Sequence, residues 1–301
     1  MEGDGPELNL ALAQIAEDEI KQFFISFCKW HFICHGADVG YETEKEGVVS
    51  IDLLFDCFNP FRNQKEVVLI QVKNYTSINP SKLNEHLNSL RESQRNLSLS
   101  HDFANSYRIK QLGTYEFNNS IIVYKFKDYS LINRKTLLQQ VKLSKRVGSG
   151  KPPIIQYLDN LELSRFYYFK KEMSDYDTIE YYYPRYLKND IVTYHSYLSL
   201  DYLRSDFILG RALKSSTEEE IKFILYLNHP SEPMFRFFES IGDRFMFDFD
   251  WVILGLGKQD HFQKYKNWAE SELSAENIRK IPQICILNNS MELQVDLKRG
   301  Y

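Results

Sequence analysis

Two short apolar segments joined by a turn constrain the fold of this chain more than any other feature. Residues 48–58 and 66–73 both have the composition of β-strands, and the six residues between them, NPFRNQ at 59–64, have the composition of a turn. The two segments therefore predict a β-hairpin.

Helices and a further strand surround the predicted hairpin. An amphipathic helix is expected over 8–33, because its apolar residues recur at helical spacing. Downstream we expect a helix over 80–97 with Pro80 at its first position, a strand over 120–126 and a helix over 133–143. The order helix, hairpin, helix, strand, helix indicates an α/β unit.

The best linker candidate is residues 145–153, which collect two glycines and two prolines in a chain with only 13 and 9 of them. We therefore expect one domain at 1–147 and a second, α+β domain at 153–301. A chain of 301 residues is longer than one core normally holds, which also favours two domains. In the second domain the pattern predicts the following elements: a helix at 217–228, a strand near 245–254, a helix at about 259–273 and a terminal hairpin around 288–289.

Tyrosines are concentrated in the second domain, where ten of the twenty lie between residues 167 and 202. They could pack a core, form a partner interface or stack nucleic-acid bases. We expect this aromatic-rich domain to serve interaction or substrate recognition.

Charge is distributed unevenly behind a net charge of −4. Residues 1–56 hold twelve acids and three bases, whereas 125–151 hold eight bases and one acid. Bulk charge gives no reason to expect a nucleic-acid partner, but the basic stretch could either grip phosphates or form a solvated helix face and linker.

Four cysteines without a CxxC pair do not form a disulfide framework, which favours a reducing compartment. The N-terminal residues lack the pattern of a signal peptide, and no apolar run is long enough for a membrane span. We therefore expect a cytoplasmic protein with no membrane partner.

Polar residues interrupt both strands of the hairpin. Asp52 lies within an apolar strand, where an unpaired carboxylate is costly. Gln71 and Lys73 are two residues apart and project from one face, while Ile70 and Val72 point into the core. Paired strands would bring Asp52, Gln71 and Lys73 together, and oxygen ligands beside an ammonium suit a hard divalent cation and an attacking water.

Asp52 followed by Gln71-Val72-Lys73 resembles the signature of the restriction-endonuclease-like, PD-(D/E)xK, nucleases, in the variant with Gln in place of the central acid. The similarity extends over about residues 10–130 and is greatest to the effector nucleases of bacterial anti-phage defence systems. It implies a restriction-endonuclease-like α/β core, a mixed sheet flanked by helices. It also implies a metal-dependent endonuclease, with DNA expected in preference to RNA although the motif itself does not distinguish them.

The resemblance also implies roles for individual residues. Mg²⁺, or Mn²⁺, would be held by Asp52, Gln71, the Val72 carbonyl and a glutamate of the first helix, and Lys73 would orient water or neutralise charge. On the helical wheel Glu17 falls at the rim of the buried face and is the expected ligand, with Glu19 as the alternative. Further expected partners are nucleic acid and a partner subunit or second copy. Six basic residues are candidates for nucleic-acid contact: Lys82, Arg91, Arg95, Lys142, Lys145 and Arg146.

Four alternatives are weighed at this point. Asp52 and Lys73 could form a cross-strand ion pair on an ordinary sheet, and the protein could be a catalytically inactive, nuclease-like scaffold that binds nucleic acid or a partner. Cys28, His31 and His35 fall on one stripe of the predicted first helix, but one helix cannot surround a zinc ion, so buried thiols and a core histidine are favoured. Asp248 and Asp250 could bind metal or mark a strand end.

Overall fold

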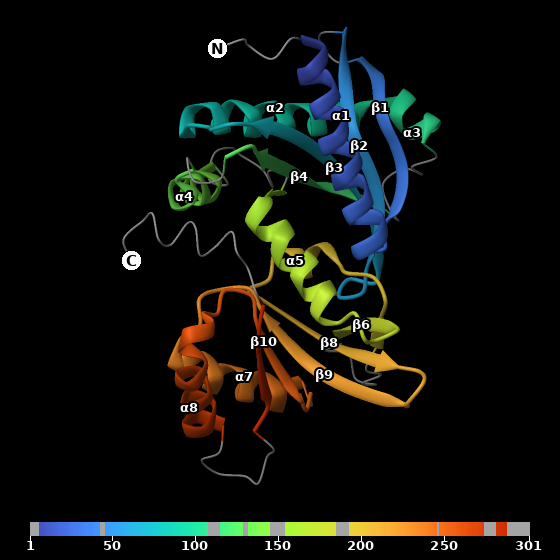
Figure 1. The fold of residues 1–301 in the computed structure, drawn as a ribbon. Helices are drawn as coiled ribbons and strands as arrows, with labels where there is room; N and C mark the ends of the chain where they lie inside the picture. The colour runs from blue at the N-terminus through green and yellow to red at the C-terminus, as the bar shows by residue number, and fades with distance from the viewer. Residues whose placement is uncertain are drawn as a thin grey trace. The chain divides into compact units, whose positions relative to one another are not determined.

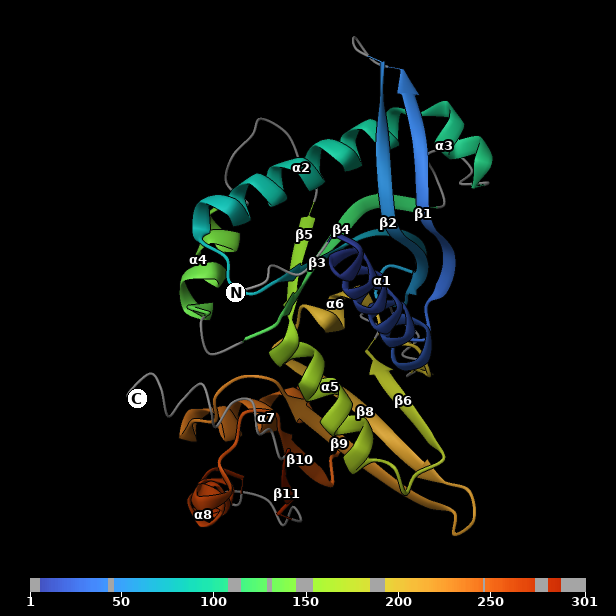
Figure 2. The same ribbon diagram turned by 45° about the horizontal axis from the view of Figure 1, so that its top comes forward.

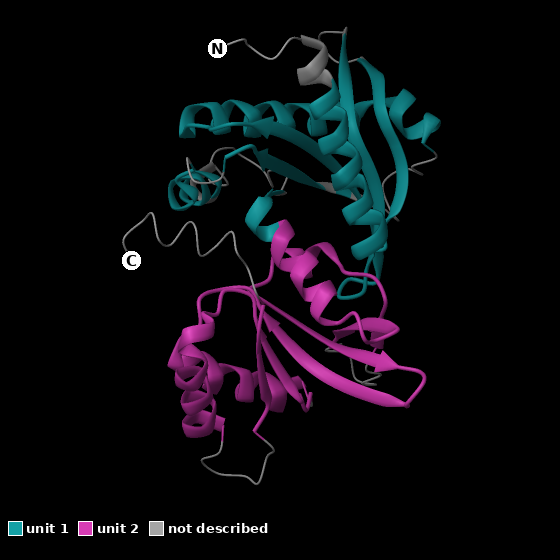
Figure 3. Ribbon diagram, in the orientation of Figure 1, with its two compact units in different colours: residues 1–162 teal, residues 163–301 magenta. Residues whose placement is uncertain are grey.

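The computed structural model contains two compact units, residues 1–162 and 163–301 (Figure 3). The structure describes the residues 6–42, 46–107, 115–128, 132–144, 154–184, 193–245, 247–273 and 281–287. Among the helices of this described part, none is long and apolar enough to cross a membrane.

The first unit is built on a five-stranded sheet with strands in sequence order (Figure 1). The strands are β1 (His31–Glu42), β2 (Glu46–Asn59), β3 (Gln64–Tyr75), β4 (Tyr115–Phe126) and β5 (Ile154–Asp159). The first three pair antiparallel, and β4 and β5 run parallel to β3. The predicted β2–β3 hairpin and the mixed sheet are therefore confirmed.

Helices cover both faces of this sheet. They are α1 (Pro6–Gln22), α2 (Pro80–Leu99), α3 (His101–Ser106) and α4 (Arg134–Ser144) (Figure 2). Successive residues of β3 show which helix covers which face: the Asn74 amide donates to the Leu12 carbonyl of α1, and the Tyr75 hydroxyl bonds His86 of α2. Because successive strand residues project to opposite faces, α1 and α2 flank the sheet.

The predicted first helix is too long, and β1 was missed. The α-helix ends at Gln22 and continues as one π-helical turn, Phe23–Phe27, before the chain turns at Lys29, which has a φ of 58°. The phenylalanines of this turn are buried, so the apolar pattern continues past the end of the α-helix. His31 and His35 consequently lie on a strand, and the helical stripe that joined them to Cys28 does not exist.

The first unit extends beyond the expected boundary at 147–153. Residues 154–159, which the sequence predicts to lie in the second domain, form β5 and pair with β4. Asp159 is fully buried, accepts a hydrogen bond from the Leu161 amide at the start of α5 (Asn160–Glu172) and pairs with Arg134 at 2.9 Å. The linker candidate at 145–153 lies outside the described residues.

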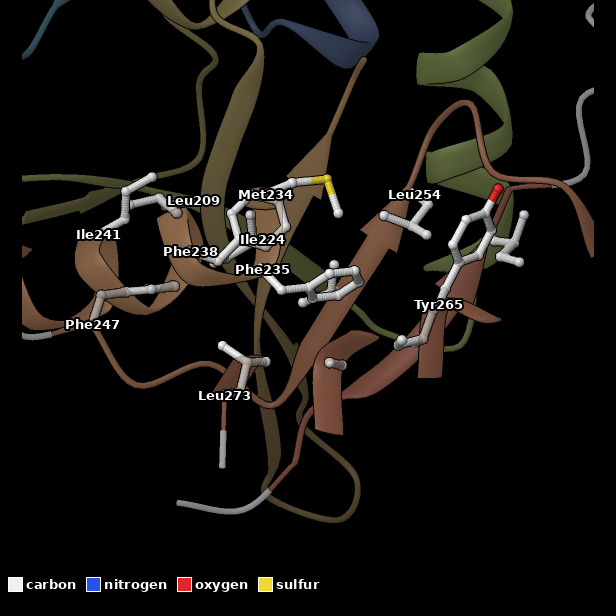
Figure 4. Packing of buried hydrophobic residues seen from close by; sticks show 14 of the residues in the cluster. Leu209, Ile224, Met234, Phe235, Phe238, Ile241, Phe247, Leu254, Tyr265 and Leu273 are labelled. Atoms are coloured by element: carbon white, nitrogen blue, oxygen red, sulfur yellow. The ribbon is translucent and has the colours of Figure 1, made fainter. Parts of the chain in front are cut away.

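The second unit has a six-stranded sheet in the order β11-β10-β9-β8-β6-β7. Its strands are β6 (Thr178–Tyr183), β7 (Thr193–His195), β8 (Phe207–Lys214), β9 (Glu219–Tyr226), β10 (Trp251–Leu254) and β11 (Gln283–Ile286). Its other helices are α6 (Leu200–Leu203), α7 (Glu232–Phe245) and α8 (Phe262–Leu273). Figure 4 shows its core, where Phe235 and Phe238 of α7 pack with Leu254 of β10 and Tyr265 of α8.

Several predictions for the second unit need correction. The expected helix at 217–228 is strand β9, which pairs with β8, because a short apolar run in a buried strand has the same composition as a buried helix. Helix α7 was missed. The helix expected at 259–273 is confirmed as a 3₁₀ turn, Gln259–His261, followed by α8. The strand β11 pairs parallel with β10, and the rest of the expected terminal hairpin lies outside the described residues.

Four tyrosines of the cluster are core residues. Tyr183 donates to the Tyr197 carbonyl at 2.9 Å, and the hydroxyl of Tyr202 donates to the Tyr182 carbonyl. Core packing is therefore confirmed for Tyr181, Tyr182, Tyr183 and Tyr202, which are all almost fully buried. Tyr167 differs, because 52% of its surface is exposed.

Candidate active site

The candidate site begins where strands β2 and β3 separate. Their ladder runs from Asn59↔Gln64 to Leu53↔Ile70, and Asp52 and Gln71 follow immediately. Instead of a further backbone pair, the Asp52 carboxylate accepts a hydrogen bond from the Val72 amide at 2.9 Å. This bond holds Asp52 against β3, beside Gln71.

The side-chain amide oxygen of Gln71 accepts no hydrogen bond from the described residues. This atom, Oε1, is also buried. Buried polar atoms are nearly always satisfied, so an orphaned oxygen at this position calls for a ligand. An amide oxygen is a good donor for a hard divalent cation.

Glu17 of α1 lies within electrostatic range of Asp52 and Lys73. Burial is the main cause that raises the pKa of Glu17, and the charge of Asp52 raises it further, against His35 and Lys73. Burial also raises the pKa of Asp52, although Lys73, the Val72 amide and His35 act in the opposite direction. Two desolvated carboxylates that repel each other are stabilised by a bound cation.

The alternative ligand, Glu19, lies elsewhere on α1. Its carboxylate pairs with the Lys125 ammonium of β4. The structure therefore brings Glu17, and not Glu19, into electrostatic contact with Asp52.

Lys73 lies at the centre of the site. It is partly buried on β3 and paired in register with Tyr124 of β4. Its charge lowers the pKa of Asp52, Glu17 and His86, which places it within electrostatic range of all three. Lys73 attracts Asp52, as the ion-pair alternative requires, but it also acts on Glu17. This attraction leaves the Gln71 oxygen without a hydrogen-bond partner among the described residues.

Two histidines at the site were missed from the sequence. His35 of β1 places Nε2 3.6 Å from the Glu17 carboxylate. His86 of α2 lies between Tyr75 and Tyr124. The pattern of His35 was misread as helical, and His86 carries no local signal because its neighbours come from β3 and β4.

The candidates for nucleic-acid contact are not all alike. Lys82 is exposed and pairs with Glu85 at 2.8 Å, and Arg95 is exposed. Arg91 is half-buried, donates to Asn88 at 3.0 Å and has its pKa lowered by burial. The structure describes the backbone of Lys142 at the end of α4 but not its side chain, and Lys145 and Arg146 lie outside the described residues.

We call the site where β2 and β3 separate the fork, and it comprises Glu17, Asp52, Gln71, Val72 and Lys73. Its donors suit an oxygen-preferring cation. Among the described residues, no three His, Cys, Asp or Glu side chains are grouped as metal ligands. The fork offers instead two carboxylates, Glu17 and Asp52, together with the Gln71 amide oxygen. These donors fit Mg²⁺ or Mn²⁺ better than a structural zinc ion.

Comparison with protein-family profiles matches residues 7–162 to the GAPS4 protein PD-(D/E)XK nuclease domain. The match covers the whole first sheet and all residues of the fork. Comparisons with curated proteins and with solved structures gave no match.

Proposed function

Because the chain belongs to the GAPS4 PD-(D/E)XK nuclease family, with a restriction-endonuclease-like core, we propose that it is a metal-dependent endonuclease that hydrolyses phosphodiester bonds. DNA is the proposed substrate in preference to RNA. The observation that carries the metal dependence is the Gln71 oxygen, which is buried beside the Asp52 carboxylate and has no hydrogen-bond partner among the described residues.

Each residue of the fork has a proposed role. Asp52, Gln71, Glu17 and the Val72 carbonyl would hold the cation, while the Val72 amide fixes the carboxylate of Asp52. A bound Mg²⁺ or Mn²⁺ supplies Lewis acidity toward the scissile phosphate and lowers the pKa of a water molecule. Lys73 orients that water and offsets the charge that develops on the phosphate oxygens.

We further propose that the second unit binds a protein partner, either another subunit or a second copy of the chain. A cavity of about 760 Å³ opens where β9, β10 and β11 begin. Among the described residues, its charged lining consists of Glu219, Glu220, Asp250, Glu270 and Lys266. An excess of carboxylates repels phosphates, so this surface is better suited to protein than to nucleic acid.

The proposed setting is bacterial anti-phage defence in the cytoplasm. All four cysteines are free, as expected in a reducing compartment. The defence role derives from the family and is tested by phage challenge of cells that express wild-type or Lys73→Ala protein.

Incubation of the purified protein with plasmid DNA, and in parallel with RNA, tests the activity. We expect cleavage in Mg²⁺ or Mn²⁺, none in EDTA, and none with Lys73→Ala, because this ammonium acts at the scissile phosphate. Lys65→Ala is the matched control, because Lys65 lies at the far end of the same strand. Full activity of Lys73→Ala would overturn the assignment.

An inactive, nuclease-like scaffold predicts a different result. Such a scaffold would cleave neither DNA nor RNA in the presence of any divalent metal. This would hold for the protein alone and for the protein mixed with the product of a neighbouring gene. Retained nucleic-acid binding without cleavage would favour this alternative.

A further inference from the structure

A tyrosine, a histidine and a second tyrosine form a hydrogen-bonded row beside Lys73. Tyr75 lies two residues after Lys73 on β3, and Tyr124 is the register partner of Lys73 on β4. Residues at these positions share one face of the sheet. His86 of α2 bridges the tyrosines, with Nε2 3.3 Å from the Tyr75 hydroxyl and Nδ1 2.7 Å from the Tyr124 hydroxyl.

Burial decides the direction of the first hydrogen bond. Tyr124 is 0% exposed, and within the described part of the chain its hydroxyl bonds only to His86. If this hydroxyl accepted from His86, its own proton would be buried without an acceptor, which is costly. Tyr124 therefore donates to Nδ1.

The second hydrogen bond follows from the first. Burial, with the charges of Lys73 and Lys82, lowers the pKa of His86, so the ring is neutral and carries its proton on Nε2. Nε2–H then donates to the Tyr75 oxygen. The phenolic proton of Tyr75 is left to donate to another group, and Tyr75 is partly exposed on the face that carries Lys73.

We propose that Tyr75 donates a hydrogen bond to a phosphate oxygen of the bound nucleic-acid strand, next to the phosphate at Lys73, and that His86 and Tyr124 are positioning residues for it. This inference rests on the proposed function and adds a substrate contact to it. Lys82 lies within electrostatic range of both Tyr75 and His86, while its ion-pair partner Glu85 acts on His86 in the opposite direction.

Tyr75→Phe removes only the donor. We expect kcat/KM for DNA cleavage to fall about 10- to 100-fold, because hydrogen bonds to charged groups are among the stronger ones. The control is Tyr176→Phe, which removes a hydroxyl bonded to Glu219 in the second unit and leaves cleavage unchanged. Equal kcat/KM for Tyr75→Phe and wild type, with folding intact, would overturn the inference.

A double-mutant cycle separates positioning from simple support of the fold. His86→Ala and Tyr124→Phe should each lower kcat/KM in the wild-type background. In the Tyr75→Phe background each should lower kcat/KM by less than about twofold further, because both residues act through Tyr75. Full additivity would assign His86 and Tyr124 to the fold alone and overturn the positioning roles.

A binding measurement keeps this test independent of the proposed function. The affinity of a labelled DNA duplex is measured by fluorescence anisotropy in an Asp52→Ala background, with and without Tyr75→Phe. We expect weaker binding with Tyr75→Phe and an unchanged salt slope, because tyrosine is uncharged, whereas Lys82→Ala should lower the slope. Failure of the wild-type protein to cleave would overturn the proposed function. Equal DNA affinity of the two Asp52→Ala proteins, or no DNA binding by either, would overturn the phosphate contact of Tyr75.

Discussion

Asp52 and Asp250 make the same hydrogen bond in different units of the molecule. Each carboxylate accepts the backbone amide of a neighbouring strand at 2.9 Å, Asp52 from Val72 and Asp250 from Lys222. Asp52 is mostly buried, lies next to an amide oxygen that has no partner in the described part of the chain, and is within electrostatic range of Glu17 and Lys73. Asp250 instead lines a cavity where β10 begins. The bond that orients a carboxylate is thus common to both units, and the neighbouring groups determine what chemistry that carboxylate can perform.

Removing each aspartate gives the sharpest test of that difference. Asp52→Ala should lower the cleavage rate about a thousandfold or more, because the metal and the developing charge lose their anchor. Asp250→Ala should change it less than twofold. Equal losses measured in the plasmid assay would mean that the two sites do not differ in function.

Glu17 and Glu19 provide the same comparison within one helix. Glu17→Gln should lower cleavage about 10- to 100-fold and raise the Mn²⁺ concentration needed for half-maximal rate, because it removes a carboxylate from the fork. Glu19→Gln removes a surface ion pair with Lys125 and should have little effect. A larger loss with Glu19→Gln would exchange the two assignments.

Stability without metal should move in the opposite direction to activity. Burial raises the pKa of Asp52 and Glu17, so the folded protein binds their protons more tightly than the unfolded chain, and stability falls as the pH rises through that range. Asp52→Asn should therefore raise Tm by a few degrees at pH 7 in EDTA. The gain should shrink below about pH 4, where the unfolded carboxyl is also protonated. Calorimetry of both proteins across pH measures the gain in Tm at pH 7 and its decrease at low pH. A lower Tm for Asp52→Asn than for wild type at pH 7 would contradict this account.

The smallest effect is expected at the acidic cavity of the second unit. Glu220→Gln combined with Glu270→Gln should leave DNA cleavage within about twofold of wild type, because the cavity is proposed for protein rather than nucleic acid. A large change in KM for DNA would move substrate recognition into this unit.

The fork could be predicted from the sequence because its signal is local. Asp52, Gln71 and Lys73 are polar residues at fixed positions in two apolar strands joined by a short turn, and the pairing of these strands follows from the turn. The family match, over residues 7–162, includes these three residues.

Other elements depended on contacts that a single sequence does not display. The sequence does not display β1, because buried phenylalanines continue the helical pattern through a π-helical turn. It predicts a helix in place of β9, because β9 is apolar on both faces. β5 pairs with β4, and His86 of α2 bonds tyrosines of β3 and β4. Both arrangements depend on contacts between residues that lie far apart in the sequence. Local periodicity carries no information about either.

The central claim is that Asp52, Gln71 and Glu17 hold a divalent cation at the fork. Mn²⁺ binding is measured by electron paramagnetic resonance in the presence of an uncleavable DNA duplex, since a site with one fewer acid is expected to bind metal weakly alone. We predict a bound Mn²⁺ signal in wild-type protein that is lost in Asp52→Asn and weakened in Gln71→Leu, with Asp250→Asn unchanged. Equal Mn²⁺ binding by wild type and Asp52→Asn would contradict the account.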